Sequence, residues 1–254
     1  MTNLPVPSYM EFFNDDYLGA YRETISPENA VVESAFVHRV LQLPRDAEVL
    51  DLCCGHGRHA VILALTGLRV TGLDLSDAYL ERAAAIAAEA GVNLPLVRSD
   101  MREIPFEGRF DAVINIFTSF GYLNSDSEDM KVLHQVARAL KPGGQFLIDL
   151  INREWVVSNY VRDERKVVPN GTVYQERREI DLLHSRINNS FWVTTPDGTT
   201  HHTDGLTIRL YSLTELVRML NAAGLAYRTV YGGYELEPYD IESRRMIVVA
   251  DKAR

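Results

Sequence analysis

The sequence predicts an α/β protein with a doubly wound, mostly parallel seven-stranded sheet and an antiparallel β insertion after strand five. Two observations predict this class. Between residues 45 and 152, short apolar runs alternate with helix-like segments, and several runs are apolar along their full length, as expected for parallel strands covered on both faces. After Asn152, polar and apolar residues alternate between turn dipeptides, which is typical of antiparallel hairpins.

The alternating region supplies the first five strands and the helices between them. Strands are expected at 48–52, 69–73, 94–98, 110–116 and 145–150. Helices are expected at 58–66, 76–90 and 127–140. Gly67 stops the first of these helices and Gly91 caps the second, because glycine readily takes the left-handed conformation that ends a helix. Short right-handed crossovers between such elements give a doubly wound sheet.

The N-terminal residues 1–44 are predicted to form a helical segment that can close over the core as a lid. Pro27 follows a serine and precedes Glu28, which is a favourable opening for a helix. Aromatic residues recur at helical spacing before this point: Tyr9, Phe12, Phe13, Tyr17 and Tyr21.

Residues 45–152 and 212–254 are predicted to form one Rossmann-like core, and residues 153–211 a β-rich insertion. Within the insertion, Asn170-Gly171 and Asp197-Gly198 indicate hairpin turns between three or four strands. The closing elements are a helix at 213–223 and strands at 225–231 and 245–250, which can pair as a hairpin.

Composition excludes several classes of protein. The net charge of -9 argues against a nucleic-acid binder, and the basic clusters at 162–166, 177–178 and 244–245 are interpreted as solvated faces. The two cysteines are adjacent, so no disulfide framework is expected, and a reducing compartment fits. The first 17 residues lack the features of a signal peptide, and the apolar runs are too short for a membrane span. A cytoplasmic location without membrane contact is therefore expected.

A glycine turn follows the first strand, in the stretch Asp51-Leu-Cys-Cys-Gly55-His-Gly57. Two close glycines let backbone N–H groups approach a ligand without interference from a Cβ atom. Asp74 ends the next strand, where a carboxylate can accept hydrogen bonds from both hydroxyls of a ribose. The sequence therefore predicts a nucleoside-binding site at this edge.

The glycine pattern alone does not identify the ligand. Gly55, Gly57 and Ala60 formally satisfy the dinucleotide fingerprint, so an NAD(P)-dependent oxidoreductase is a competing interpretation. Three features favour another nucleoside. Asp51 would repel a pyrophosphate but attract an ammonium group. Asp100 adds a third acid after the third strand. The closing helix and hairpin differ from the elements of a dinucleotide-binding half-domain.

With these residues the chain resembles the class I S-adenosylmethionine-dependent methyltransferases, whose first motif is an acid followed by three glycines at alternate positions. Cys53 replaces the first glycine and is expected to narrow the backbone's approach to the methionine moiety. The resemblance implies S-adenosylmethionine as cofactor, with Asp51 and Gly55 against its methionine part. The remaining cofactor residues that it implies are Asp74 on the ribose, Leu75 on the adenine, Asp100 and Met101 at the adenine amino group, Asn115 and Ile116 along the pocket, and Cys53, Gly57, Tyr17 and Tyr21.

The resemblance also implies methyl transfer to a small-molecule acceptor, at nitrogen or oxygen. Residues 117–122 and 146–152, with the insertion, are similar to bacterial small-molecule methyltransferases, including N-methyltransferases of amino sugars. In those relatives the insertion shapes the acceptor site or a dimer contact, so a monomer or a homodimer is expected. A non-catalytic module that binds S-adenosylmethionine stays open as an alternative.

No catalytic base is assigned. The methyl donor is already a strong electrophile, so the protein mainly aligns the reactants and excludes water. Tyr17, Tyr122 and His201 are candidates by position if the acceptor must lose a proton. No metal is expected, because His56 and His59 lack a third ligand.

Overall fold

The computed structural model describes residues 19–21 and 23–254, which divide into two compact units. The core unit comprises Pro27–Val156 and Tyr211–Arg254. The insertion unit comprises Val157–Leu210 and the described residues up to Ser26. No helix in the described part of the chain is long and apolar enough to cross a membrane.

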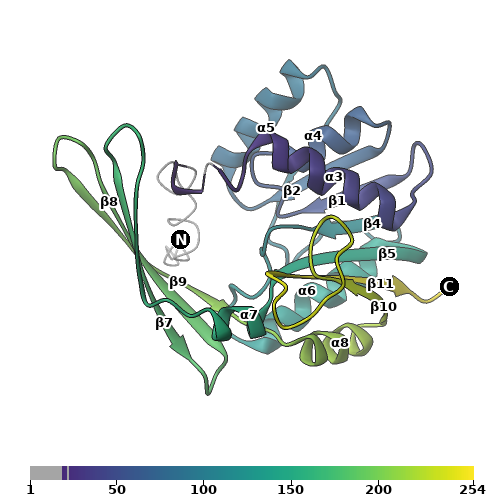
Figure 1. The fold of residues 1–254 in the computed structure, drawn as a ribbon. Coiled ribbons are helices and arrows are strands. Elements are labelled where there is room, and N and C mark those ends of the chain that lie inside the picture. Colours follow the sequence, from purple (N-terminus) through teal and green to yellow (C-terminus); the bar gives the residue numbers. More distant parts are fainter. Residues whose placement is uncertain (1–18, 22) are drawn as a thin grey trace, which may run out of the picture. The chain divides into compact units, whose positions relative to one another are not determined.

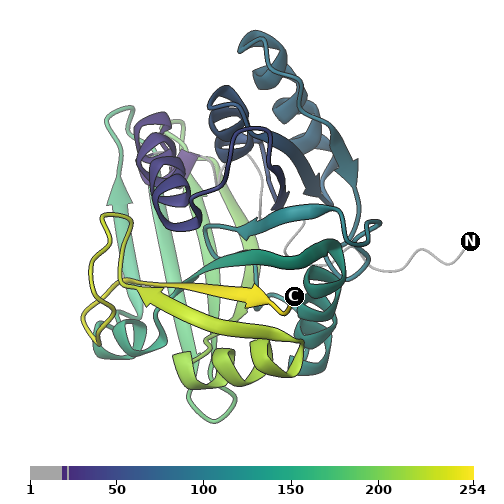
Figure 2. The same cartoon turned by 90° about the vertical axis from the view of Figure 1, so that its right-hand side faces the viewer.

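The described strands of the core unit form one seven-stranded sheet in the order β10-β11-β5-β4-β1-β2-β3, which confirms the predicted fold (Figure 1). The strands are β1 (Glu48–Leu52), β2 (Arg69–Asp74), β3 (Leu96–Arg98), β4 (Phe110–Asn115), β5 (Leu140–Ile151), β10 (Leu225–Tyr231) and β11 (Arg245–Lys252). Pairing is parallel from β5 through β3, whereas β11 pairs antiparallel with both β5 and β10 (Figure 2). The chain order reverses between β1 and β4, which is where open α/β sheets bind ligands.

Helices cover both faces of this sheet. The described helices are α3 (Pro27–Leu41), α4 (Arg58–Leu65), α5 (Asp77–Glu89), α6 (Asp126–Ala139), α7 (Arg153–Ser158) and α8 (Leu213–Ala222). In Figure 1, α3, α4 and α5 lie on one face and α6 and α8 on the other. Val49 packs with Phe36 on the first face, and the next residue, Leu50, packs with Leu133 on the second. Burial of both faces explains why consecutive residues of β1, Val49 and Leu50, are both apolar.

The described strands of the insertion unit form one antiparallel sheet in the order β6-β7-β8-β9. They are β6 (Asp163–Val167), β7 (Val173–Asp181), β8 (Arg186–Thr194) and β9 (Thr200–Arg209). Gly171 and Gly198 have φ values of 88° and 87° in the two turns that the sequence predicts. The turn between β7 and β8 lacks glycine, and Asp181 stabilises it by accepting hydrogen bonds from the backbone amides of Leu183 and His184.

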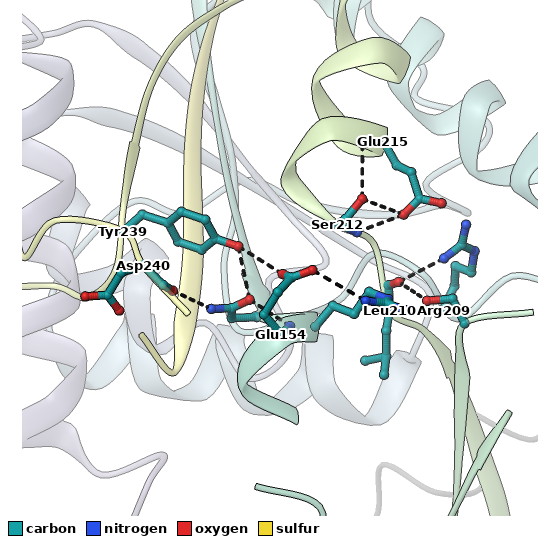
Figure 3. Close-up of polar contacts among 10 residues, drawn as sticks. Glu154, Arg209, Leu210, Ser212, Glu215, Tyr239 and Asp240 are labelled. Atoms are coloured by element: carbon teal, nitrogen blue, oxygen red, sulfur yellow. Dashed lines mark hydrogen bonds and ion pairs between the residues drawn. The ribbon is translucent and has the colours of Figure 1, made fainter. Parts of the chain in front are cut away.

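A reciprocal cap begins α8, immediately after the insertion (Figure 3). Ser212 Oγ accepts from the backbone amide of Glu215 at 3.3 Å, and Glu215 Oε2 accepts from the backbone amide of Ser212 at 2.9 Å. The preceding residue, Tyr211, is buried and donates its hydroxyl to Asp129 Oδ2 at 2.7 Å. The cap and the buried tyrosine together fix where the chain re-enters the core.

Replacing Ser212 by alanine is expected to lower the free energy of unfolding by about 1 kcal/mol, because the first turn of α8 loses a capping acceptor. Equilibrium urea unfolding measures this. Thr214→Ala is the matched control, since Thr214 is an exposed residue of the same turn, and its effect is expected to stay below about 0.5 kcal/mol. Equal losses in the two variants would contradict the capping role.

Candidate functional site

The turn between β1 and α4 passes through left-handed backbone three times. Cys53, Gly55 and Gly57 have φ values of 60°, 54° and 80°. A Cβ atom on Gly57 would lie 2.9 Å from Ala83 Cβ of α5, so this glycine lets two helices pack closely. A Cβ atom on Gly55 would meet no described atom within 4 Å, so this side of the turn is open to a ligand. Cys53 adopts the conformation that glycine usually supplies, at a cost of about 1–2 kcal/mol.

Asp51 lies one residue before the end of β1 and is 2 % exposed. Its Oδ2 atom is buried and has no hydrogen-bond partner among the described residues. Burial raises the pKa of this carboxyl to about 7, the Arg58 guanidinium opposes the rise and Asp74 adds to it. The backbone amide of Ala60 donates to this carboxyl, and the buried Oδ2 atom that keeps no donor favours a positively charged ligand group.

Asn115 presents a second acceptor at the end of the adjacent strand β4. Its Nδ2 donates to the backbone oxygen of Leu52 at 2.8 Å, which ties β4 to β1. Its Oδ1 is buried and unpartnered within the described part of the chain. Asp51 pairs in register with Ile114, so the two unpartnered acceptors lie at neighbouring strand ends. Because side chains alternate along a strand, Asp51 lies on the sheet face of Ile114 and Asn115 on the opposite face, so each acceptor needs its own donor.

Asp74 links the glycine turn to the end of β2. Its Oδ2 accepts from the backbone amide of Gly55 at 2.8 Å, and its Oδ1 accepts from that of Ser76 at 2.9 Å. Burial raises its pKa, and these backbone bonds oppose the rise. Ser76 rather than Asp74 caps α5, because Ser76 Oγ accepts from the backbone amide of Tyr79. Each oxygen of Asp74 retains acceptor capacity for a hydroxyl group, and the half-buried Leu75 follows it.

Asp100 follows β3 and already has a cationic partner. Its Oδ1 and Oδ2 accept from Arg102 Nε at 2.9 Å and Arg102 Nη2 at 2.6 Å. Burial acts to raise the pKa of Asp100, but the hydrogen bonds from Arg102 outweigh it and lower the pKa. Met101 Sδ lies 3.7 Å from Cys53 Sγ, so the structure brings this loop to the glycine turn.

A buried carboxylate of α3 binds the first two residues of α4. Glu33 is 4 % exposed, and its Oε2 accepts from Arg58 Nη1 and lies 2.6 Å from His59 Nε2. Burial lowers the pKa of His59, and Glu33 opposes this. Within the described residues no three ligand-type side chains could hold a metal ion. Glu33 is not predicted by any local pattern, because it lies 25 residues before its partner Arg58.

A second buried carboxylate fixes the turn that follows β4. Asp149 of β5 accepts from Arg245 Nε at 2.7 Å, Tyr234 Oη at 2.6 Å and the backbone amide of Phe117 at 2.8 Å. Phe117 and Thr118 are left-handed, with φ values of 71° and 59°. The interpretation of residues 244–245 as a solvated basic face is therefore wrong for Arg245, whose partner at the end of β5 cannot be inferred from the local sequence.

The remaining candidates lie in several parts of the chain. Tyr122 is half-buried beyond the turn that follows β4, and Ile116 is buried just before that turn. His201 is exposed on β9, and Tyr21 belongs with it to the insertion unit. Tyr17 and the aromatic residues before it lie outside the described residues.

Comparisons with known proteins agree with this geometry. A family model described as a methyltransferase domain matches residues 49–144. The chain is 31% identical over 199 residues to a dTDP-3-amino-3,6-dideoxy-alpha-D-glucopyranose N,N-dimethyltransferase of Streptomyces fradiae, covering 75% of this chain and 74% of the relative. It is 30% identical over 234 residues to the cypemycin N-terminal methyltransferase of a Streptomyces species, covering 90% and 91%. An S-adenosylmethionine-bound amino pentose methyltransferase from Micromonospora echinaspora shares the fold, with a TM-score of 0.71, 21% identity and full coverage of both chains.

Replacing Asp51 by asparagine is expected to stabilise the ligand-free protein at pH 8. A carboxyl whose pKa rises from 3.8 to about 7 on folding binds more protons when folded, so its contribution to stability is present at low pH and is lost as the pH rises through about 7. The expected gain in unfolding free energy is on the order of 3 kcal/mol at pH 8 and small at pH 4.

Thermal and urea unfolding at the two pH values measure this gain. Asp111→Asn is the control with opposite sign. Burial acts to raise the pKa of Asp111, but its hydrogen bond to Lys141 outweighs burial and lowers the pKa, so asparagine is expected to destabilise at pH 8. A loss of stability in Asp51→Asn at pH 8 would refute the buried, unpartnered state of Asp51.

Proposed function

Because the chain belongs to the class I S-adenosylmethionine-dependent methyltransferases, we propose that it binds S-adenosylmethionine at the carboxyl ends of β1, β2 and β4 and methylates a small amine. Two relatives support nitrogen as the acceptor atom, since their names describe an amino-sugar dimethyltransferase and an N-terminal methyltransferase. Ubiquinone O-methyltransferases match about half of the chain, so a hydroxyl acceptor is the second candidate.

The observation that carries the choice of cofactor is the unpartnered carboxylate at the glycine turn. Asp51 Oδ2 and Asn115 Oδ1 are buried acceptors without donors in the described residues. The ammonium group of the methionine moiety fits Asp51, whereas the pyrophosphate of a dinucleotide would meet a buried negative charge. The open side of Gly55 gives room for the same moiety. Asp74 would take the ribose hydroxyls, Leu75 would pack on the adenine, and Asp100 and Met101 would border it.

S-Adenosylmethionine supplies an activated methyl group, so the chain itself need only hold the acceptor in line and exclude water. A neutral amine needs no base before attack, because its lone pair is free. Burial raises the pKa of both cysteine thiols well above the ordinary value, which disfavours the thiolate that a nucleophile requires. The turn at Phe117 and Thr118, which Asp149 holds, continues directly from Asn115 and would border the reacting methyl group.

We further propose that the segment before α3 acts as a lid that brings Tyr17 and Tyr21 to the cofactor, with Tyr122 and His201 as candidate bases for acceptors that must lose a proton. The helix α3 itself, which the sequence assigned to the lid, belongs to the core unit. The insertion unit would shape the acceptor side or mediate a homodimer. Its turn between β7 and β8 exposes Leu182 and Leu183, which are 61 % and 87 % exposed. Two free cysteines support a cytoplasmic location.

Replacing Asp74 by alanine is expected to weaken S-adenosylmethionine binding by about 1–3 kcal/mol, because the ribose hydroxyls lose a charged acceptor. Isothermal titration measures the change. Asp77→Ala is the control, since Asp77 is exposed three residues further on and pairs with the exposed Arg98. Unchanged affinity in Asp74→Ala, or tight NADH binding by the wild type, would contradict the assignment.

Incubation with methyl-labelled S-adenosylmethionine and a panel of acceptors tests the reaction. The panel contains nucleotide-linked amino sugars, peptides with free N-termini and catechols. Label is expected in an amine, with a rate that rises with pH as the amine loses its proton. Label in catechols alone would refute the amine assignment, and cofactor binding without any product would favour a non-catalytic binding module.

A further inference from the structure

Two side chains on one face of the insertion sheet have acceptor atoms that the described residues leave without a donor. β7 and β8 pair along their full length, and Arg178 of β7 lies opposite Asn189 of β8 (Figure 1). Two residues away on each strand, Glu176 lies opposite Phe191. Side chains alternate along a strand and paired residues share a face, so these four lie together on one face of the sheet.

Asn189 carries the first of these acceptor atoms. Its Oδ1 atom is buried and has no hydrogen-bond partner in the described part of the chain. The strand register changes beside it, because β9 has one more residue than β8 between two successive pairs, at Asn189 and Phe191. Such a bulge re-aims neighbouring side chains and is common next to ligand sites. A buried amide without a partner costs free energy, so a donor from outside the described residues is expected here.

Glu176 carries the second acceptor atom. Its side chain is only 10% exposed, and Arg178 Nη2 donates to its Oε2. The same nitrogen donates to Glu164 Oε2 at 2.6 Å, whereas Glu176 Oε1 accepts no hydrogen bond from the described residues. Burial raises the pKa of Glu176, and Arg178 opposes the rise. Arg178 thus holds one oxygen of a nearly buried carboxylate and leaves the other for a further donor.

An apolar surface adjoins the two acceptors. The rings of Tyr174 and Phe191 lie with their centroids 5.9 Å apart. Both belong to the face of Glu176, because Tyr174 is two residues before it on β7 and Phe191 is its partner on β8. A carboxylate and an amide beside aromatic rings suit a small polyhydroxylated ring, whose O–H groups meet the oxygens while its C–H groups pack on the aromatic surface.

We propose that Glu176 and Asn189 are specificity-determining residues that bind hydroxyl groups of the methyl acceptor, away from the nitrogen that reacts. Each oxygen accepts from one O–H group, and Arg178 is a positioning residue that orients Glu176. The two side chains occupy diagonal positions of the sheet, about 7–8 Å apart, which one ring of a small polyol spans. This inference rests on the proposed function, because it names the class of amine that the enzyme methylates: an amine that carries several hydroxyl groups.

A purely structural role for the two residues makes different predictions. If Glu176 only pairs with Arg178, its replacement lowers stability and affects all acceptors alike. If Asn189 has a structural donor, its replacement by leucine destabilises the protein. If only a ligand satisfies Asn189, Asn189→Leu removes an unsatisfied buried atom and raises the melting temperature of the ligand-free protein.

Isothermal titration into the protein saturated with S-adenosylhomocysteine, the demethylated donor, tests the proposal. The probes are glucosamine, an amine with several hydroxyl groups, and cyclohexylamine, a ring amine with none. The wild type is expected to bind glucosamine at least about tenfold more tightly, since cyclohexylamine cannot form the hydrogen bonds. Glu176→Gln and Asn189→Leu are each expected to weaken glucosamine about tenfold and to leave cyclohexylamine within about threefold. Glu179→Gln, on the opposite and exposed face of β7, is the matched control and is expected to change neither affinity.

Equal affinity of the wild type for the two probes would overturn the proposal, as would equal weakening of both probes in the variants. If a variant does not fold, the wild-type comparison still decides. A lower melting temperature of ligand-free Asn189→Leu would also overturn the role of Asn189, because it would show a structural partner. Failure of the wild type to bind S-adenosylhomocysteine would instead refute the proposed function, whereas binding without a preference for glucosamine refutes only the role of Glu176 and Asn189.

Discussion

The buried ion pair between Asp149 and Arg245 is the interaction on which the ligand-binding edge of the sheet depends. Asp149 is fully buried, and Arg245 contacts both of its oxygens, at 2.7 and 2.6 Å. The same carboxylate accepts from the Phe117 amide, and Arg245 also donates to Thr118 Oγ1 at 2.8 Å. Removing one partner of such a pair costs about 3–5 kcal/mol. The pair therefore fixes β5, β11 and the left-handed turn after β4 as one assembly, and strain in that turn persists because several contacts determine it.

The succession of strands and helices and the insertion were predictable because the signals are local. Burial on both faces makes neighbouring residues of β1 and β4 apolar, and Asn170-Gly171 and Asp197-Gly198 have the residues that tight hairpin turns require. The extent of β5 was not predictable. Residues 141–144 contain a proline and two glycines, which indicate a helix end, yet the strand already begins at Leu140, with a register irregularity against β4. Pairing with a neighbouring strand overrides the local preference of these residues.

The acids of the candidate site could be predicted because each ends a strand, and parallel strands bring their carboxyl ends to one edge. Asp51 and Asp74 lie there in the structure, and Asp74 contacts the Gly55 amide. The side chains that support them come from distant segments. Arg245 lies 96 residues from Asp149, so the sequence around the arginine does not indicate which acid it pairs with. The position of an acid at a strand end can be read from the neighbouring residues. The partner of a buried ion pair cannot, because it comes from a distant segment.

The unpartnered oxygen atoms at the strand ends also bear on how long the protein survives in a cell. Buried acceptors on Asp51 and Asn115 without a ligand make the empty protein less stable than the loaded one, and ligand binding shifts the folding equilibrium by mass action. Proteases act on the opened population, which is larger for the empty form. Cellular abundance of this methyltransferase is therefore expected to follow the supply of its donor, because degradation removes empty chains first.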